Sequence, residues 1–305
     1  MPRELYGLSR DEIRAFTRMS NLAGIWAIAS TWAVIAATCA AVHHVPLLFP
    51  LAVVILGGRQ LALAVIMHEG AHGTLFRTRK LDLLVDLTCA APVWADITRY
   101  RKHHLGHHAH TGTDRDPDLA LAPTEPMSCA SFRRKILRDL TGASGVRRVI
   151  GLLLIDLDLL VFNVGGDIAR APRRGFPHHA RAGVKNLWKP IVTNVALALV
   201  LGWVYLAWVV AYLTVFSLVL RLRSLAEHAG LERTADPFRN TRTTYASLLA
   251  RATVAPLHVN YHLEHHLLPT VPWFRLPALH RAIAGEIPES SVEPSYAAVL
   301  ARMHR

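Results

Sequence analysis

The chain has 305 residues, 52% of them hydrophobic, and a formal net charge of +12 at pH 7. A mean hydropathy of +0.26 is high for a soluble protein of this length, so membrane segments are expected. The basic excess would also suit a nucleic-acid binder. Arginines kept on the cytoplasmic side of a membrane protein explain it better, and we expect no nucleic-acid partner.

The first apolar segment, 22–42, contains no charged residue and is long enough to cross roughly 30 Å of hydrocarbon. After a turn at 43–46, the segment 47–67 returns across the membrane. Lysines and arginines lie beyond both open ends of this pair and none lies in its turn, so the positive-inside rule places both ends in the cytoplasm. The sequence therefore predicts a helical hairpin, preceded by a cytosolic segment at 1–21.

The segment 149–164 is ambiguous. Its apolar side chains favour membrane insertion by roughly 4 to 7 kcal/mol, whereas central Asp156 and Asp158 would oppose insertion by roughly 5 to 7 kcal/mol. We expect a helix that lies at the membrane interface or against the bundle.

A second hairpin is expected in the apolar run 190–220. As one straight helix this run would measure about 46 Å, which is more than a membrane needs. Basic residues flank both ends and the middle has none, which favours two legs near 187–205 and 206–223. The total is four crossings, with both termini in the cytoplasm.

Histidine is over-represented, with 18 residues, and four clusters stand out. All four lie on the cytoplasmic side in the two-hairpin topology. They are His68 and His72 in HEGAH; His104, His107 and His108 in HHLGHH; His228 alone; and His262, His265 and His266 in HLEHH.

The spacing of these histidines indicates metal binding. On a helix, positions i, i+3 and i+4 share one face, so each H-x-x-H-H box aims three imidazoles in one direction. Neutral imidazole binds iron, zinc, copper or nickel. Nine imidazoles exceed the three or four protein ligands that one zinc takes, and they suit two metal ions.

Two readings of the histidines other than a two-metal oxidase stay open. His68, Glu69 and His72 also spell the H-E-x-x-H motif of zinc proteases, in which Glu69 would be the general base and one zinc would suffice. A non-catalytic metal transporter or sensor is the other reading, although its histidines would more naturally line the membrane interior.

The boxes H-x-x-x-H, H-x-x-H-H and H-x-x-H-H, in this order, together with HHAHTGTDRDPD and NYHLEHHLLPTVPWFRLPALH, resemble the integral-membrane fatty acid desaturase family. That superfamily also holds lipid hydroxylases and carotenoid ketolases. The resemblance covers about residues 45–285 and implies a single domain over 1–305, with a C-terminal tail at 286–305. The expected fold is all-α: about four transmembrane helices in two hairpins, with a cytosolic helical cap that holds a histidine-rich di-metal site.

The resemblance implies two non-haem irons held by the nine histidines, with O₂ as co-substrate and no catalytic side chain beyond the metal centre. Removal of two hydrogens from an unactivated chain gives an alkene, whereas transfer of oxygen gives an alcohol. Six polar side chains beside the boxes are candidates for orienting the ligand rings, at odds close to those for ordinary polar positions. They are Glu69, Asp116, Asp118, Glu227, Asn260 and Glu264.

The function implied is O₂-dependent desaturation of a fatty acyl chain that enters from the bilayer. Hydroxylation or ketolation of a lipid, carotenoid or smaller molecule is the alternative. We find no haem-binding or ferredoxin-like cysteine motif in the chain, so a separate electron donor is expected: a ferredoxin, a cytochrome b5-like protein or a reductase.

Overall fold

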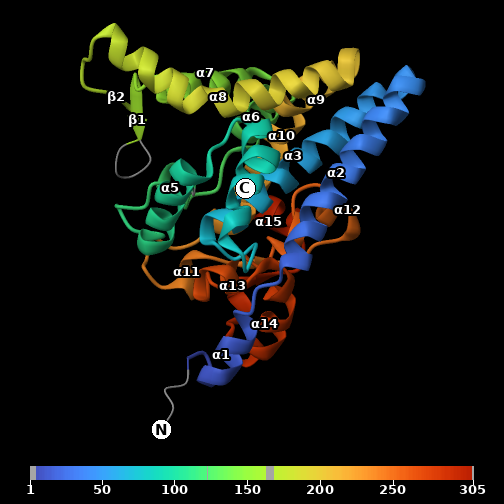
Figure 1. Cartoon of the computed structure of the whole chain (residues 1–305). Coiled ribbons are helices and arrows are strands. Elements are labelled where there is room, and N and C mark those ends of the chain that lie inside the picture. Colours follow the sequence, from blue (N-terminus) through green and yellow to red (C-terminus); the bar gives the residue numbers. More distant parts are fainter. Residues whose placement is uncertain (1–4, 122, 163–167, 304–305) are drawn as a thin grey trace.

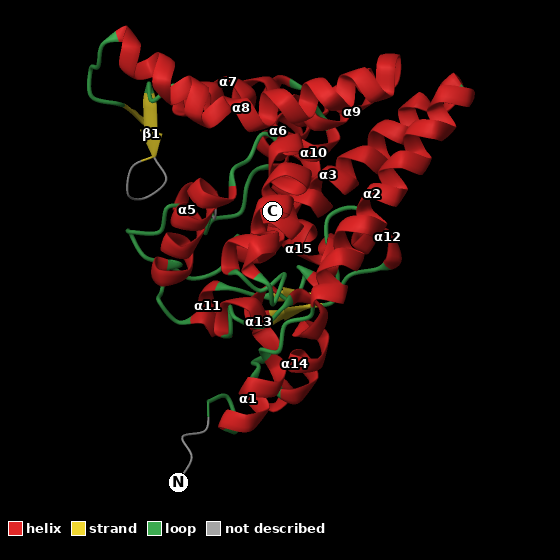
Figure 2. Ribbon diagram, in the orientation of Figure 1, coloured by secondary structure: helices red, strands yellow, loops and turns green. Residues whose placement is uncertain are grey.

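A computed structural model describes residues 5–121, 123–162 and 168–303 of the chain. Helices dominate the described part, and the strands are short (Figure 2). The helices are α1 (Arg10–Phe16), α2 (Asn21–His44), α3 (Phe49–His72), α4 (Asp82–Val85), α5 (Ile97–His110), α6 (Cys129–Leu140), α7 (Ala143–Asp156), α8 (Phe176–Leu201), α9 (Tyr205–Leu213), α10 (Val215–His228), α11 (Pro237–Asn240), α12 (Leu248–Ala252), α13 (His262–Leu267), α14 (Leu276–Ala282) and α15 (Tyr296–Arg302). Strands β1 (Leu160–Phe162) and β2 (Ile168–Arg170) pair antiparallel, and β3 (Thr243–Thr244) and β4 (Val292–Glu293) pair parallel.

The first apolar pair forms a helical hairpin, α2 and α3, as the sequence predicts (Figure 1). The Ser20 hydroxyl caps the start of α2 by accepting from the backbone of Ala23. At the other open end, α3 stops at Gly73, whose φ of 71° lies in the left-handed region that glycine adopts without strain. The Asn21 amide oxygen accepts backbone hydrogen bonds from Arg77 and Thr78, at 2.9 and 3.2 Å, and so joins the two open ends of the hairpin.

The second apolar run is broken where the sequence places a turn. Helix α8 ends at Leu201, and Gly202 takes a φ of 55° and a ψ of −132°, a conformation that suits glycine. The Tyr205 hydroxyl then donates to the side chain of Asn194 at 2.9 Å. In one continuous helix these two residues would be about 16 Å apart along the axis, so the chain reverses here. In Figure 1, α8 crosses the top of the molecule and α9 and α10 return beneath it.

Three helical stretches are long and apolar enough to cross a membrane: Arg10–His44, Pro46–His72 and Phe176–His228. The third holds 53 residues and includes the reversal at Gly202. Many apolar side chains on these stretches point away from the protein. Leu199 and Val200, for example, each leave 82% of their surface uncovered, as lipid-facing residues would.

The expectation of one helix over 149–164 holds only as far as Asp156, where α7 packs against α8 and α9, and it is wrong beyond that residue. Helix α7 ends at Asp156, and strand β1 follows after a turn at Asp158, whose φ is 56°; residues 163 and 164 lie outside the described part. The carboxylate of Asp156 is buried and forms an ion pair with Arg99 on α5. Because this aspartate finds a partner on another helix, it anchors the end of α7 to α5.

Helix α3 lies at the centre of the fold, where it contacts α2, α5, α9 and α10. Its second half, from Leu56 onward, is almost fully buried. The described part of the expected tail, 286–303, is also packed: Val299 and Met303 on and after α15 are buried against the end of α10. The histidine boxes therefore lie between a central helix and an outer layer of C-terminal segments.

Candidate metal centre

Four helices bring the histidine boxes together. His68 and His72 lie in the last turn and a half of α3, and the second box lies on α5, whose first turn is capped by the Asp96 carboxylate. His228 is the last residue of α10. The third box makes up most of α13, a helix of six residues from His262 to Leu267.

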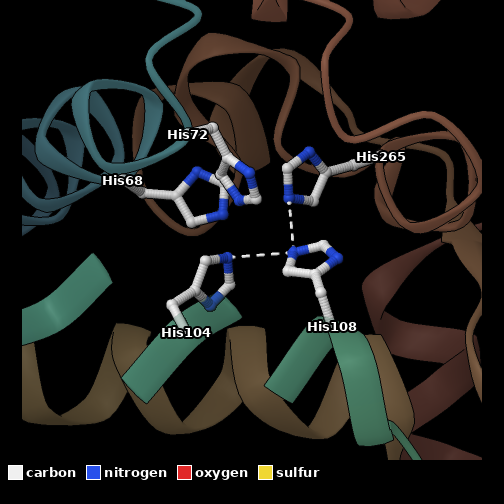
Figure 3. Close-up of side chains that lie close together, drawn as sticks. All are labelled: His68, His72, His104, His108 and His265. Carbon is white, nitrogen blue, oxygen red and sulfur yellow. Dashed lines mark hydrogen bonds between the residues drawn. The ribbon is translucent and has the colours of Figure 1, made fainter. Parts of the chain in front are cut away.

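The nine histidines form two groups. In each group every residue offers a ring nitrogen within 4.8 Å of those of the others. Group one is His68, His72, His104, His108 and His265 (Figure 3). Group two is His107, His228, His262 and His266.

Each H-x-x-H-H box is shared between the two groups, which the sequence reading did not foresee. On α5, His104 and His108 belong to group one and His107 to group two. On α13, His262 and His266 belong to group two and His265 to group one. At 3.6 residues per turn, position i+4 lies about 40° to one side of position i and position i+3 about 60° to the other. One box therefore supplies two adjacent sites.

The ring nitrogens are placed as ligands to a cation would be. Within group one the Nε2 atom of His108 lies 3.0 Å from those of His104 and His265. Within group two the Nε2 atom of His262 lies 2.9 Å from that of His228 and 3.1 Å from that of His266. Among the described residues of the two groups, Nε2 of His68 and Nε2 of His72 are buried without a hydrogen-bond partner. Convergent, unpartnered imidazole nitrogens fit iron, for which imidazole is a suitable ligand.

The electrostatics of the cluster favour neutral rings, the form that binds metal. Burial lowers the pKa of His108 to about 2, helped by positive charge on neighbouring rings. The same causes, burial first, hold the pKa well below its ordinary value in His104, His262, His265 and His266.

His107 is the exception, because it has a carboxylate partner. Burial alone would lower its pKa, but the hydrogen bond to Asp116 and the negative charges nearby outweigh burial and raise it. The Nδ1 atom of His107 lies 2.8 Å from Asp116, which also accepts from the backbone of Gly112 and Asp118. The ring is thus fixed by a carboxylate that is itself fixed, which leaves Nε2 for a metal.

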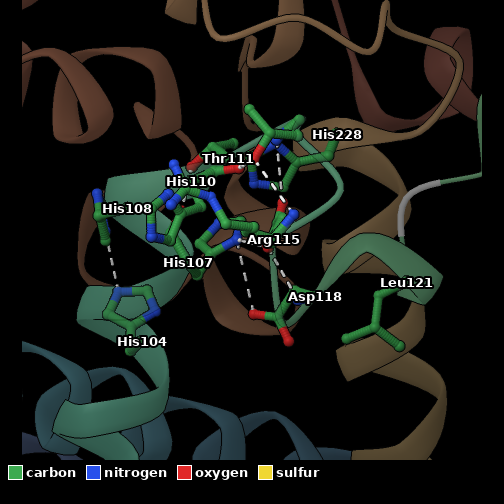
Figure 4. Close-up of polar contacts among 12 residues, drawn as sticks. His104, His107, His108, His110, Thr111, Arg115, Asp118, Leu121 and His228 are labelled. Atoms are coloured by element: carbon green, nitrogen blue, oxygen red, sulfur yellow. Dashed lines mark hydrogen bonds and ion pairs between the residues drawn. The ribbon is translucent and has the colours of Figure 1, made fainter. Parts of the chain in front are cut away.

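Two further rings of group two are oriented from outside. The backbone carbonyl of Asn240 lies 2.9 Å from Nδ1 of His228. Glu227 lies 3.4 Å from Nδ1 of His262 and is itself held by Arg223 at 2.6 Å. Figure 4 shows the polar contacts on the α5 side of this group.

In the described part of the chain, the carboxylate that contacts group one is that of Glu69, whose Oε1 atom lies 3.5 Å from Nδ1 of His68. The other oxygen of Glu69 accepts from the Thr74 hydroxyl at 2.9 Å and from the backbone of Trp273 at 3.0 Å. The carboxylate is therefore buried and occupied by structural contacts. This arrangement speaks against Glu69 as the general base of a zinc protease.

Three of the six candidates for orienting the rings contact other groups. Glu264 bonds to Thr243 and His280, and Asn260 bonds to the backbone of Thr244, so both fix α13 to its surroundings. Asp118 lies 2.9 Å from the ring of His103 and farther, at 3.8 Å, from the ring of His107. The nine histidines themselves are all found in the two groups; that they bind iron stays a prediction.

A cavity of about 420 Å³ adjoins the histidines. Apolar side chains from α3, α7 and α10 form much of its wall, and His104, His107, His228 and His262 also line it. Sequence reasoning missed the cavity and its residue Arg148, because the partners of Arg148 come from α9 and α10. It also missed Arg223, although the partner of Arg223, Glu227, lies four residues further along the same helix. One signal for the cavity wall was available in the sequence. Tyr100 and His104 are four residues apart on α5, so they share a face, and their rings stack with centres 5.0 Å apart.

Residues 44–296, well over half of the chain, match the family described as fatty acid desaturase. The chain belongs to the fatty acid desaturase family. This finding confirms the resemblance carried by the histidine boxes, and it identifies the protein as an oxidoreductase of that family with a histidine-rich metal site.

Two relatives of this desaturase-family chain carry more specific names. Dihydrorhizobitoxine desaturase of Bradyrhizobium elkanii is 30% identical over 277 residues, which cover 87% of this chain and 75% of the relative. Zeaxanthin 4-ketolase of Chlamydomonas reinhardtii is 25% identical over 237 residues, which cover 73% of this chain and 42% of the relative. The family thus holds relatives named for different substrates and different outcomes.

Proposed function

We propose that the protein is an O₂-dependent di-iron desaturase that introduces a double bond into the apolar chain of its substrate, with a fatty acyl chain as the leading class. The observation that carries the proposal is the pair of adjacent histidine groups whose members His104, His107, His228 and His262 line a largely apolar cavity. An apolar chain in that cavity would present a C–H bond to the metal centre.

The overall reaction balances with an external reductant. The substrate gives up two protons and two electrons, and O₂ accepts four electrons and four protons to give two waters. A donor protein supplies the remaining two electrons, and solvent supplies the remaining two protons. Two irons bound by the histidine groups would supply the activation of O₂. The donor is a separate protein, a ferredoxin, a cytochrome b5-like protein or a reductase.

In this proposal the residues of the chain bind the metals, orient the ligand rings and enclose the substrate. The nine histidines hold the metals, and Asp116 and Glu227 keep the rings of His107 and His262 turned toward them. Apolar side chains such as Met67, Leu152 and Phe216 line the cavity and exclude water from the reacting end.

The proposed topology has four membrane crossings, with the histidine boxes and both termini on the cytoplasmic side. Two observations support two hairpins: the bonds of Asn21 to Arg77 and Thr78, and the reversal between Asn194 and Tyr205. The basic residues beyond the open ends of both hairpins support the orientation.

Oxygen insertion is the second candidate outcome, because one relative is named as a ketolase. The metal site proposed is the same for both outcomes. Hydroxylation or ketolation of a lipid, carotenoid or smaller molecule would differ from desaturation in whether oxygen reaches the product.

The test is expression of the wild type in a host with saturated lipids, with mass spectrometry of the lipids and iron analysis of the purified protein. Iron near two per chain and products lighter by two hydrogens support the proposal; a gain of one oxygen supports the ketolase or hydroxylase outcome. For variants that replace a ligand histidine by alanine, His44→Ala is the matched control, since His44 is exposed at the far end of α2. Near one zinc per chain with neither product would contradict both outcomes.

A further inference from the structure

Residues along most of α10 line the cavity. Phe216, Leu220, Ser224 and His228 recur every four residues on this helix, and all four line the cavity. From Phe216 to His228 the helix rises about 18 Å. The end at His228 belongs to the metal centre, so the end at Phe216 is where the rest of an extended substrate would lie.

Arg148 of α7 occupies that far end in a fixed position. Its guanidinium carbon lies 4.6 Å from the ring centres of both Tyr212 and Phe216. Its terminal nitrogens donate to the carbonyl of Tyr212 at 2.7 Å and to the hydroxyl of Ser217 at 2.9 Å. A cation stacked on two rings and bonded twice loses little further entropy when it binds a ligand.

Among the described residues, Arg148 lacks the carboxylate partner that the other arginines of the cavity have. Arg223 pairs with Glu227, and Arg99 pairs with Asp156. Arg148 has only neutral acceptors, and its Nε atom is buried without a hydrogen-bond partner. A charge held against an apolar membrane stretch with no opposite charge is costly.

We propose that the substrate supplies the missing negative charge: Arg148 binds the anionic head group of an amphipathic substrate, a carboxylate or a phosphate, while the apolar chain runs along α10 to the histidines. This inference rests on the proposed function, because only a di-iron centre at the histidines gives the apolar chain a reason to point toward them. Arginine matches both anions through paired N–H donors. The cavity volume of about 420 Å³ suits a ligand of modest size. A neutral hydrocarbon would leave Arg148 uncompensated.

The experiment measures binding, not turnover. Purified wild-type protein in nanodiscs of uncharged lipid is titrated calorimetrically with dodecanoate, dodecyl phosphate and dodecanol, with empty nanodiscs as the blank for partitioning. We expect the wild type to prefer at least one anion over the alcohol by roughly 10- to 100-fold, the range for a charged hydrogen bond. The anion that binds more tightly tells a free acid from a phospholipid-like substrate.

Two variants on α7 sharpen the result. Arg148→Gln is expected to bind dodecanol as the wild type does and to lose the preference for the anion. Arg147→Gln, an exposed neighbour with the same charge, is the matched control and is expected to keep it. An equal loss for all three probes would show that Arg148 only joins α7 to α9 and α10, and would overturn the proposal.

Equal wild-type affinity for acid and alcohol also overturns the inference, and it needs no variant to fold. The proposed function fails separately. Selective anion binding by an iron-loaded protein that forms no O₂-dependent product would refute the desaturase proposal and leave the anion site standing.

Discussion

The two histidine groups are built from the same residue type, yet their surroundings differ. Group two contributes three of its four histidines to the cavity wall, whereas group one contributes only His104 of its five. Group two is oriented by Asp116, Asn240 and Glu227, and group one has the more distant Glu69. The difference indicates that group two would lie nearest a substrate in the cavity and depends most on its supporting residues, while group one depends on burial beside α3.

Removing one ligand from either group should have the largest effect. His265→Ala in group one and His262→Ala in group two are each expected to abolish product and to lower bound iron from near two to near one per chain. The expected loss exceeds the roughly 100-fold that changing a partner of a ligand costs. Retained turnover in either variant, with membrane insertion intact, would remove that histidine from the ligand set.

Changing the supporting carboxylates should separate the groups. Asp116→Asn is expected to weaken iron binding by roughly 10- to 100-fold, because Asp116 bonds directly to a ligand ring. Glu69→Gln should cost less, since Glu69 lies 3.5 Å from its histidine. Iron retention during chelator titration gives the measurement, with exposed Asp114→Asn as the control. A larger effect of Glu69→Gln would reverse the assigned order.

The cavity wall can be disturbed without touching either group. A Cβ at Gly145 would lie 2.2 Å from the carbonyl oxygen of Leu213, so Gly145→Ala must push α7 from the end of α9. We expect a loss of about 1 to 3 kcal/mol in stability and weaker dodecanoate binding, with iron content unchanged. Gly151→Ala on the same helix meets nothing within 4 Å and should be neutral or stabilising by up to about 1 kcal/mol.

Thermal unfolding midpoints of the two glycine variants report the stability difference. If Gly145→Ala also released iron, the cavity wall and the metal groups would be one cooperative unit, and the contrast between wall and ligands would be wrong.

The smallest effect concerns protons in metal-free protein. The folded pKa of His108 is about 2, below its ordinary 6.5, so below about pH 6.5 the unfolded chain binds a proton that the folded chain does not. The free energy of unfolding should therefore decrease as the pH is lowered through that range. His108→Asn should flatten the dependence by up to about 1.4 kcal/mol per pH unit. Unfolding midpoints between pH 5 and 7 test this; identical slopes would contradict the lowered pKa.

Sequence reasoning succeeded where one segment carries its own signal. The charge-free run at 22–42 becomes α2 (Asn21–His44), because continuous apolar length acts locally, and the break expected in the run 190–220 from the placement of basic residues lies at Gly202. It failed in 149–164 only after Asp156, whose buried carboxylate is compensated by Arg99 from a distant helix. Arg148 was missed for the same reason, since its ring and carbonyl partners come from α9 and α10.

The sequence alone determined the family, the first helical hairpin and the nine histidines that could bind metal, because spacing and hydrophobicity can be read along one segment at a time. Only the tertiary structure decided how each H-x-x-H-H box is divided between two groups and which group faces the cavity. The direction of each imidazole follows from the helical period, but its neighbours depend on how α3, α5, α10 and α13 pack.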